Sequence, residues 1–385
     1  MKPVSEIQRF FQPPEKQSYF LFGPRGTGKS RFLRNYYPKA QFLDLLDGAT
    51  FFQYQNNPSR LNALVAAMND NQTLVIDEVQ KIPSLLSQVH QILESDEYPK
   101  IQFVLTGSSS RKLKKQGVDL LAGRAVLRHM HPFLACELGS SFNLQNSLQQ
   151  GLIPLVLGSH QSDETLSSYI SVYLREEVKQ EGLVKNLEAF SRFLEALSFS
   201  HGEILNLSNI SRECSVKRST LDGYLEVLED LLLGFRIPPF KKRNRKSTVD
   251  SEKFYFFDTG IFRSLRPIGP LDEPLKIQGP ALEGLVIQNI KAWASYRQNK
   301  EQIYFWRTEA GNEVDIIIYG PKTFEAIEVK NTQKIRPEDL SGLQSFAKDY
   351  PTANLKLLYR GKTREKYHKI ECIPVEDYLL SLRIK

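Results

Sequence analysis

The sequence has few cysteines and no long apolar run. It contains only three cysteines in 385 residues, and Cys136, Cys214 and Cys372 form no C-x-x-C pair. An odd, widely spaced set argues against a disulfide framework and against a zinc ribbon, and it favours a reducing compartment. No apolar stretch approaches the roughly 18 residues of a membrane-spanning helix, and the N-terminal residues lack the apolar segment of a signal peptide. We therefore expect a cytoplasmic protein that does not enter the membrane.

The residue patterns of several enzyme classes are also missing. Six dispersed histidines show no metal-ligand spacing, and no G-x-S-x-G or Cys–His arrangement suggests nucleophilic catalysis. The composition is that of an ordinary folded protein, with 41% hydrophobic and 25% charged residues. A net charge of +7 mildly favours a polyanionic partner. The length indicates two or three domains.

The first third of the chain alternates short apolar runs with helical patterns. The apolar runs span residues 19–22, 42–46, 74–76 and 101–105. The helical patterns span residues 30–37, 59–68 and 83–93. Buried strands that alternate with helices are typical of a parallel sheet covered on both faces, so we predict an α/β fold here.

A glycine-rich segment follows the first apolar run and forms a complete G-x-x-x-x-G-K-S. Its residues are Gly23, Pro24, Arg25, Gly26, Thr27, Gly28, Lys29 and Ser30. Backbone N–H groups of such a loop surround a phosphate, and the following helix presents its positive N-terminus to the same anion. We expect Lys29 to reach the β- and γ-phosphates and the Ser30 hydroxyl to ligate Mg²⁺. The segment predicts a P-loop that binds ATP together with Mg²⁺.

Two acidic residues directly follow the apolar run at residues 74–76. We predict that Asp77 belongs to the Mg²⁺ shell and that Glu78 polarises the attacking water. Ser108, at the end of the next apolar run, either contacts the γ-phosphate or the water, or belongs to a loop that caps a helix. Arg124 is either an arginine finger or a surface arginine. Both remain candidate catalytic residues of an ATPase.

These motifs resemble one protein family. The P-loop, the Ile76-Asp77-Glu78 strand end, the Thr-Gly-Ser-Ser segment at residues 106–109 and the Leu-Ala-Gly-Arg segment at residues 121–124 are similar to bacterial and archaeal AAA+-type ATPases with a long C-terminal domain of unknown function. Matching segments continue at residues 169–178, 255–260, 313–315 and 327–330. The resemblance covers nearly the whole chain and implies an AAA+-like ATPase. The chain departs from it at Arg175-Glu176, where members often carry Arg-Asp.

The middle of the chain predicts a winged helix. Residues 205–214 and 219–232 read as two helices joined by a short polar turn, which suits a helix-turn-helix. Lys217 and Arg218 lie at the start of the second helix, where a recognition helix touches DNA. The alternative is a winged helix that serves only as a packing module.

A basic run at residues 241–246 separates two strand-like segments, as the loop of a wing would. Its residues Lys241, Lys242 and Arg243 are candidates for phosphate contacts that are independent of nucleic-acid sequence and weaken with salt. A charge run of this kind also occurs as a solvated surface. DNA or RNA is therefore a candidate partner, and a regulatory protein is the alternative.

The last part of the chain carries an acidic pattern with one lysine. Glu283 lies near the start of a helix predicted over residues 280–296, and Asp315 lies in an apolar strand. Glu328 and Lys330 lie on the next strand, where the period of two turns them to one face. A hairpin that pairs these strands would form a two-carboxylate site for a second Mg²⁺ or Mn²⁺, closed by Glu283, with Lys330 to orient or activate water.

This pattern resembles the PD-(D/E)xK restriction-endonuclease-like core, whose chemistry is Mg²⁺-assisted phosphodiester hydrolysis. The alternative is a nuclease-like fold that serves as a binding module or scaffold. The complete fold prediction is α/β and comprises an AAA+-like P-loop core, a helical lid, a winged helix and a restriction-endonuclease-like α/β domain. The predicted boundaries of these parts are residues 1–140, 141–198, 199–255 and 256–385.

Two functions follow from this organisation. The first is an ATP-dependent switch that acts on or with nucleic acid and includes a possible nuclease domain. The second is an ATP-gated module that binds a regulatory protein, with the nuclease-like domain as a non-catalytic scaffold. The sequence leaves the oligomeric state and the nucleic-acid target open.

Overall fold

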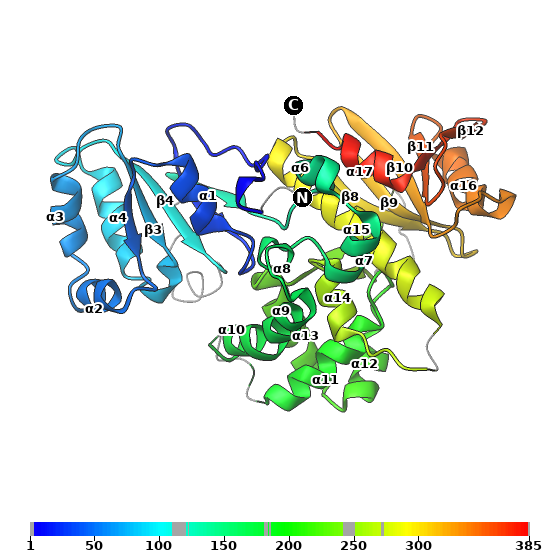
Figure 1. Ribbon diagram of the computed structural model, residues 1–385, viewed down its shortest axis with the longest axis horizontal. Coiled ribbons are helices and arrows are strands. Elements are labelled where there is room, and N and C mark those ends of the chain that lie inside the picture. Colours follow the sequence, from blue (N-terminus) through cyan, green and yellow to red (C-terminus); the bar gives the residue numbers. More distant parts are fainter. Residues whose placement is uncertain are drawn as a thin grey trace. The chain divides into compact units, whose positions relative to one another are not determined.

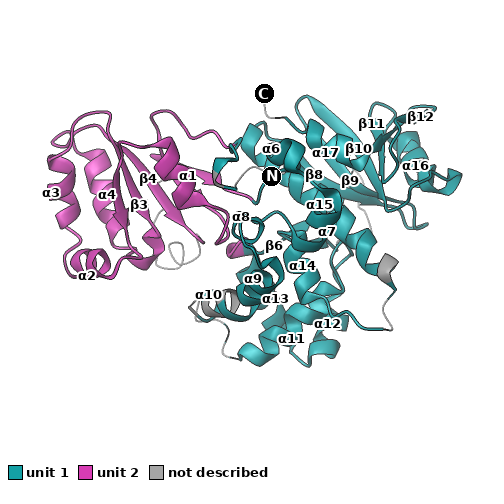
Figure 2. Cartoon of the chain, in the orientation of Figure 1, with its two compact units in different colours: residues 1–10, 132–229, 233–385 teal, residues 11–131, 230–232 magenta. Residues whose placement is uncertain are grey.

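The structure, a computed structural model, describes residues 4–109, 121, 123–180, 184, 186–241, 251–270 and 273–383. The chain divides into two compact units, which Figure 2 distinguishes by colour. The N-terminal unit comprises residues 11–131 with 230–232, and the C-terminal unit comprises residues 1–10, 132–229 and 233–385. Within the described part of the chain, no helix is long and apolar enough to span a bilayer.

The N-terminal unit is built on a sheet of parallel strands (Figure 1). They are β1 (Ser18–Phe22), β2 (Gln41–Asp44), β3 (Thr73–Asp77), β4 (Gln102–Gly107) and β5 (Ala125–His129). Their order is β2-β3-β4-β1-β5, and each neighbouring pair is parallel. The main helices are α1 (Lys29–Tyr36), α2 (Gly48–Asn56), α3 (Arg60–Ala66) and α4 (Leu85–Glu94). The predicted parallel α/β fold is confirmed and matches that of P-loop NTPases, whereas the sequence pattern did not predict β5 and α2.

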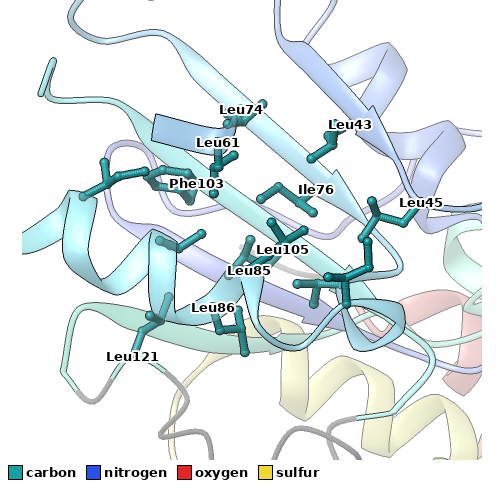
Figure 3. Close-up of a cluster of buried hydrophobic side chains, with 14 of the residues drawn as sticks. Leu43, Leu45, Leu61, Leu74, Ile76, Leu85, Leu86, Phe103, Leu105 and Leu121 are labelled. Carbon is teal, nitrogen blue, oxygen red and sulfur yellow. The ribbon is translucent and has the colours of Figure 1, made fainter. Parts of the chain in front are cut away.

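Apolar side chains fill the space between this sheet and the helices α3 and α4 (Figure 3). Leu74 of β3 and Leu105 of β4 share one buried cluster with Leu61 of α3 and with Leu85 and Leu86 of α4. The apolar residues of α4 recur at helical spacing, which gives that helix one buried face. The central strands β1 and β4 are buried along their whole length. Polar chemistry is therefore confined to the strand ends.

Short helices form the first part of the C-terminal unit after residue 131. They are α6 (Ala135–Leu138), α7 (Leu144–Gln150), α8 (Pro154–Leu157), α9 (Ser162–Ser168), the π-helical segment η4 (Tyr169–Leu174) and α10 (Arg175–Gln180). Leu166, Tyr169 and Val178 are buried, whereas Val172 is exposed. The apolar residues of this region therefore do not all face inward.

Three helices and a hairpin follow. They are α11 (Leu187–Ser198), α12 (Leu207–Cys214), α13 (Arg218–Asp230), β6 (Gly234–Ile237) and its antiparallel partner β7 (Lys253–Phe256). The chain reverses after α12 through Ser215, which has a left-handed backbone with φ of 55°. Phe190 and Phe193 of α11 pack on Tyr224 of α13, with ring centroids 5.1 and 5.4 Å apart. These rings hold the first and third helices together.

The rest of the C-terminal unit combines a mixed sheet with helices. The strands are β8 (Gln302–Arg307), β9 (Glu313–Gly320), β10 (Thr323–Lys330), β11 (Asn354–Tyr359), β12 (Glu365–Tyr367) and β13 (Ile370–Pro374), in the order β12-β13-β11-β10-β9-β8. The helices are α14 (Thr259–Leu265), α15 (Pro274–Arg297), α16 (Ser341–Asp349) and α17 (Val375–Ser381). β9 and β10 form the predicted antiparallel hairpin. Both α15 and α16 pack against β10.

The predicted start of the long helix is wrong. α15 begins at Pro274, and Pro280 lies inside it, so Glu283 occupies the middle of the helix. Proline suits a first helical turn because it lacks an N–H group, and Pro274 and Pro280 both meet this criterion. The helix begins at the earlier of the two.

Asp258 joins two segments of the C-terminal unit. Its buried carboxylate caps α14 by accepting a hydrogen bond from Gly260 N at 2.9 Å, and it accepts another from Leu152 N at 2.7 Å. Gly151 lies against the same carboxylate, and a Cβ there would come within 1.8 Å of Asp258 Oδ1. Burial raises the pKa of Asp258 to about 6 although the backbone N–H groups lower it. The loss of hydration on burial therefore has a larger effect on the pKa of Asp258 than the hydrogen bonds have.

We predict that Asp258→Asn removes a pH dependence of stability. The folded-state pKa is raised from 3.8 to about 6, so the carboxyl group adds stability below pH 3.8 that is lost as the pH rises through about 6. The unfolding free energy of the parent minus that of Asp258→Asn should therefore fall by about 2–3 kcal/mol between pH 4 and pH 7. Urea unfolding followed by circular dichroism measures it. Asp349→Asn, at the exposed end of α16, is the control, and a difference that does not change with pH would contradict the prediction.

Candidate functional site

The P-loop connects β1 to α1 in a tight turn. Gly26 and Gly28 have φ of 80° and 87°, values that favour glycine, and α1 begins at Lys29 directly after them. Gly23 lies so close to the end of β5 that a Cβ would come within 2.3 Å of Met130 O. The glycines therefore serve the turn and the close approach of two backbone segments. The half-buried Ser30 lies in the first turn of α1.

Lys29 folds back onto its own loop. Its buried ammonium donates hydrogen bonds to Gly23 O at 2.7 Å and to Pro24 O at 3.3 Å. The Thr27 hydroxyl donates to Pro24 O at 2.7 Å, while Arg25 is exposed. The structure thus places the lysine within the curl of the loop, on acceptors that a phosphate oxygen can replace.

Asp77 and Glu78 lie at the carboxyl end of β3, beside the end of β4. The Thr106 hydroxyl on β4 donates to Asp77 Oδ1 and accepts a hydrogen bond from Glu78 N at 3.1 Å. Asp77 is only 1% exposed, so this hydroxyl orients a carboxylate that water barely reaches. Glu78 has a left-handed backbone with φ of 61°, which is unusual for a residue other than glycine. Strained backbone of this kind often occurs at functional sites.

Gln80 links Glu78 to Ser108. Its buried side-chain amide donates to Glu78 Oε2 at 2.6 Å and to Ser108 Oγ at 3.2 Å. Ser108 is itself buried at the end of β4. Three polar side chains thus form a chain of hydrogen bonds across two neighbouring strand ends. Ser108 is connected to the predicted catalytic glutamate through an amide that the sequence pattern did not single out.

Arg124 forms an ion pair with Glu94 at the end of α4, and its side chain is exposed. Its role as an arginine finger stays a prediction. Lys217 and Arg218 are exposed at the turn between α12 and α13. Lys241 is partly buried after the end of β6, whereas Lys242 and Arg243 lie outside the described residues.

The acidic residues of the C-terminal unit converge. Asp315 of β9 lies close enough to Glu283 of α15 and to Glu328 of β10 for its negative charge to raise the pKa of both glutamates. Asp315 Oδ2 accepts a hydrogen bond from Val329 N at 2.8 Å. Lys330 Nζ contacts Glu328 Oε1 at 2.6 Å. The hairpin register brings the pair together, because Asp315 and Glu328 each lie one residue beyond the paired Ile316 and Ile327.

A further lysine lies among these carboxylates. Lys253 of β7, with a side chain 3% exposed, places Nζ 3.2 Å from Glu283 Oε1 and 3.6 Å from Asp315 Oδ1, and it also pairs with Glu313. The Tyr255 hydroxyl donates to Glu283. We call the set formed by Lys253, Glu283, Glu313, Asp315, Glu328 and Lys330 the carboxylate cluster.

Burial dominates the electrostatics of this cluster. Burial, and then the negative charge of Asp315, raise the pKa of Glu283 to about 7 and that of Glu328 well above its usual range. Burial lowers the pKa of Lys253, but the surrounding carboxylates, Glu283 above all, raise it well above normal. Glu328 Oε2 is buried without a hydrogen-bond partner. Among the described side chains, no three acidic, histidine or cysteine residues are arranged to hold a metal ion as they stand.

Three family models match successive parts of the chain. Residues 15–139 match an AAA domain, residues 142–272 match a domain of unknown function (DUF8612), and residues 278–378 match another (DUF4143). The match at residues 15–139 covers the P-loop and the Asp77-Glu78 strand end. This part of the chain is a P-loop ATPase domain of the AAA type.

Relatives span nearly the whole chain. Over 358 residues it is 26% identical to two uncharacterized proteins, one from Mycobacterium bovis and one from Mycobacterium tuberculosis, covering 89% of this chain and 76% of each relative. Among solved structures, the RuvB Holliday junction branch migration motor of Thermotoga maritima is 14% identical, with a TM-score of 0.31 over 58% of this chain and 82% of RuvB. That score is too low to bear on fold or function.

Sequence reasoning missed Thr106 and Gln80 in the ATPase domain and Lys253 in the carboxylate cluster. Thr106 could have been found, because polar residues at the ends of neighbouring parallel strands meet at one edge of a sheet. Gln80 carries no such signal, since its position depends on the tight turn after Glu78. Lys253 lies thirty residues before Glu283, at the start of β7, and no motif joins them.

We predict that Thr106→Val lowers ATP turnover in the ATPase domain by about 10- to 100-fold, because it removes the hydroxyl that orients Asp77. The exchange keeps the shape of the buried side chain, so nucleotide binding should change little. Turnover is measured as phosphate release, and nucleotide affinity by fluorescence titration. Thr73→Val, at the opposite end of β3, is the matched control. Unchanged turnover in Thr106→Val would contradict the assigned role.

Proposed function

We propose that this chain is an ATP-driven switch that acts on or with nucleic acid. The observation that carries the ATPase part is that one parallel sheet holds Lys29 directly after the loop that follows β1 and both Asp77 and Glu78 at the carboxyl end of β3, with the lysine on replaceable acceptors. Gly26, Gly28 and the start of α1 would cradle the phosphates. These groups fit ATP.

The donor set also fits Mg²⁺ bound with the nucleotide. Asp77 is a buried carboxylate, and the Ser30 hydroxyl lies at the start of α1, so both would hold the ion, which supplies positive charge against the phosphates. Glu78 would accept a proton from the attacking water. Gln80 and Ser108 would set the direction of the Glu78 carboxylate. ATP binding and hydrolysis would then alter the loop and this hydrogen-bonded chain.

We expect Glu78→Gln to bind ATP but to lower its turnover by at least about 100-fold, because the amide cannot accept the proton. Lys29→Ala should lose nucleotide binding, because it removes the cation that faces the phosphates. Phosphate release and fluorescence titration with an ATP analogue measure the two effects. Glu97→Gln and Lys39→Ala, exposed positions in the same domain, are the controls. Normal turnover in either site variant would refute the assignment.

The helix-turn-helix of α12 and α13 supports the nucleic-acid part of the proposal. Lys217, Arg218, Ser219 and Thr220 are all exposed at the N-terminal end of α13. Cations, hydroxyls and a helix N-terminus are the groups that contact phosphates. The hairpin β6–β7 that follows α13 gives the order of elements of a winged helix. Residues 199–255 would thus form the nucleic-acid-binding part, and residues 141–198 a helical lid.

We predict that Lys217→Ala with Arg218→Ala weakens DNA binding by about tenfold at low salt. The number of counterions released on binding, measured from the salt dependence of the affinity, should fall by about two. Fluorescence anisotropy over a range of salt concentrations measures both. Lys322→Ala with Lys348→Ala removes the same charge from exposed positions elsewhere and is the control. Repeating the titration with ATP-bound Glu78→Gln tests whether the nucleotide changes affinity. A parent protein that does not bind DNA or RNA would favour the ATP-gated protein-binding function.

The carboxylate cluster supports a second candidate activity, metal-dependent cleavage of nucleic acid. Asp315 and Glu328 lie side by side, and Glu328 Oε2 is a buried acceptor without a partner. Carboxylate oxygens of this kind suit Mg²⁺ or Mn²⁺, which would polarise a phosphodiester. Lys330 would orient the attacking water, and Glu283 would complete the acidic set. The scaffold alternative requires the same fold without a bound metal ion.

Cleavage of single- or double-stranded DNA or of RNA in the presence of Mg²⁺ or Mn²⁺ is the test of this activity. Asp315→Asn and Lys330→Ala should abolish cleavage, because they remove a metal ligand and the residue that orients water. Glu325→Gln is the matched control, because Glu325 lies on the same strand as Lys330 and pairs with Lys356 at 2.8 Å. If parent and variants leave all substrates intact, with and without ATP, the domain serves as a scaffold.

A further inference from the structure

Lys253 occupies the centre of the acidic groups in the C-terminal unit. It starts β7, where it pairs with Ile237 of β6, and the residue is 2% exposed. Its ammonium contacts carboxylates from two other elements, Glu283 of α15 and both Glu313 and Asp315 of β9. A buried lysine on three carboxylates is a counter-ion for them.

The charges of this region do not balance. The ionisable groups that interact here include five carboxylates, Glu203, Glu283, Glu313, Asp315 and Glu328, and three cations, Lys253, Arg307 and Lys330. With every group ionised, two negative charges have no counter-charge among these described residues. Uncompensated charge in a buried place is costly, so the region favours the arrival of a divalent cation or of protons.

Lys253 stands where such a cation would bind. A metal ion on Asp315 and Glu328 would use Glu328 Oε2, which lacks a partner, and an oxygen of Asp315. Asp315 Oδ2 already accepts a hydrogen bond from Val329 N, and Asp315 Oδ1 faces the Lys253 ammonium at 3.6 Å. Divalent metals bind oxygen at about 2.0–2.6 Å, so metal and ammonium would share one carboxylate at close range. Two cations that close repel strongly in a dry site.

We propose that Lys253 is a resident counter-ion that competes with a divalent metal ion for Asp315 and Glu283. The metal ion binds fully only when the ammonium withdraws. The inference rests on the metal site of the proposed cleavage activity, and it adds a means of regulation. β7 is paired to β6, which follows the proposed DNA-contacting helix α13 by a few residues. A shift of this hairpin would move Lys253 and change the affinity of the carboxylate cluster for metal.

Mn²⁺ titration of the 385-residue chain, followed by electron paramagnetic resonance, tests the competition. Asp77→Asn is the background and nucleotide is omitted, so that the ATPase site contributes no Mn²⁺ signal. In this background Lys253→Met should bind Mn²⁺ at least about tenfold more tightly than the protein with Lys253. Adding Asp315→Asn should cancel the gain, and the exposed Lys276→Met should change nothing. Equal or weaker Mn²⁺ binding by Lys253→Met would overturn the proposal.

The melting temperature is a second measurement, and it tests the proposal even if the Lys253 variants are less stable than the parent. Removing the ammonium leaves a third negative charge uncompensated, so Lys253→Met and the more polar Lys253→Gln should melt at lower temperature than the parent. Millimolar Mn²⁺ should raise their melting temperature more than it raises that of the parent. Variants that Mn²⁺ does not rescue would contradict the competition. Mn²⁺ binding without cleavage by any variant would refute the nuclease activity and leave the role of Lys253 intact.

Discussion

Carboxylates that enter the interior of this protein each require a partner, and the elements around them are arranged to supply one. Asp77 receives the Thr106 hydroxyl, and Asp258 receives backbone N–H groups. Glu137 pairs with Arg9, whose guanidinium also contacts the Tyr296 hydroxyl at 3.0 Å. Burial opposes the charge, and at least one partner of each carboxylate comes from a segment distant in sequence, which for Asp258 is Leu152 N. Satisfying these groups therefore joins segments that the apolar core alone would not fix relative to one another.

Local sequence predicted the parts of the protein whose geometry is also local. The P-loop needs closely spaced glycines between a strand and a helix, and residues 23–30 supply them at positions 23, 26 and 28. The sequence also predicted that Asp315 and Glu328 lie side by side, because the register of a hairpin fixes which residues of its two strands face each other. The parallel sheet followed from alternating strand and helix patterns. These predictions depend on contacts within a few dozen residues, where periodicity is informative.

Contacts between distant segments lay beyond the sequence pattern. Gln80 joins Glu78 to Ser108 of the neighbouring strand end through a tight turn, and no spacing rule predicts that geometry. Lys253 enters the carboxylate cluster because β7 leads into it, and a single lysine at the start of a short strand looks like any surface lysine. The start of α15 failed for a different reason, since Pro274 and Pro280 are both acceptable first residues and only tertiary packing chooses between them.

The two candidate sites share one physical feature. In the P-loop, Lys29 binds the carbonyls of Gly23 and Pro24, and in the carboxylate cluster Lys253 binds the acids that would hold a metal ion. Each lysine occupies ligand-binding space while the protein is alone. Binding must then exchange one set of contacts for another, so the net gain is smaller than the new contacts alone would give. The exchange would differ in sign, because a phosphate would recruit Lys29 whereas the proposed metal ion would expel Lys253. A P-loop lysine would then be part of its ligand's site, while the lysine of the carboxylate cluster would act against its ligand and make occupancy depend on where β7 lies.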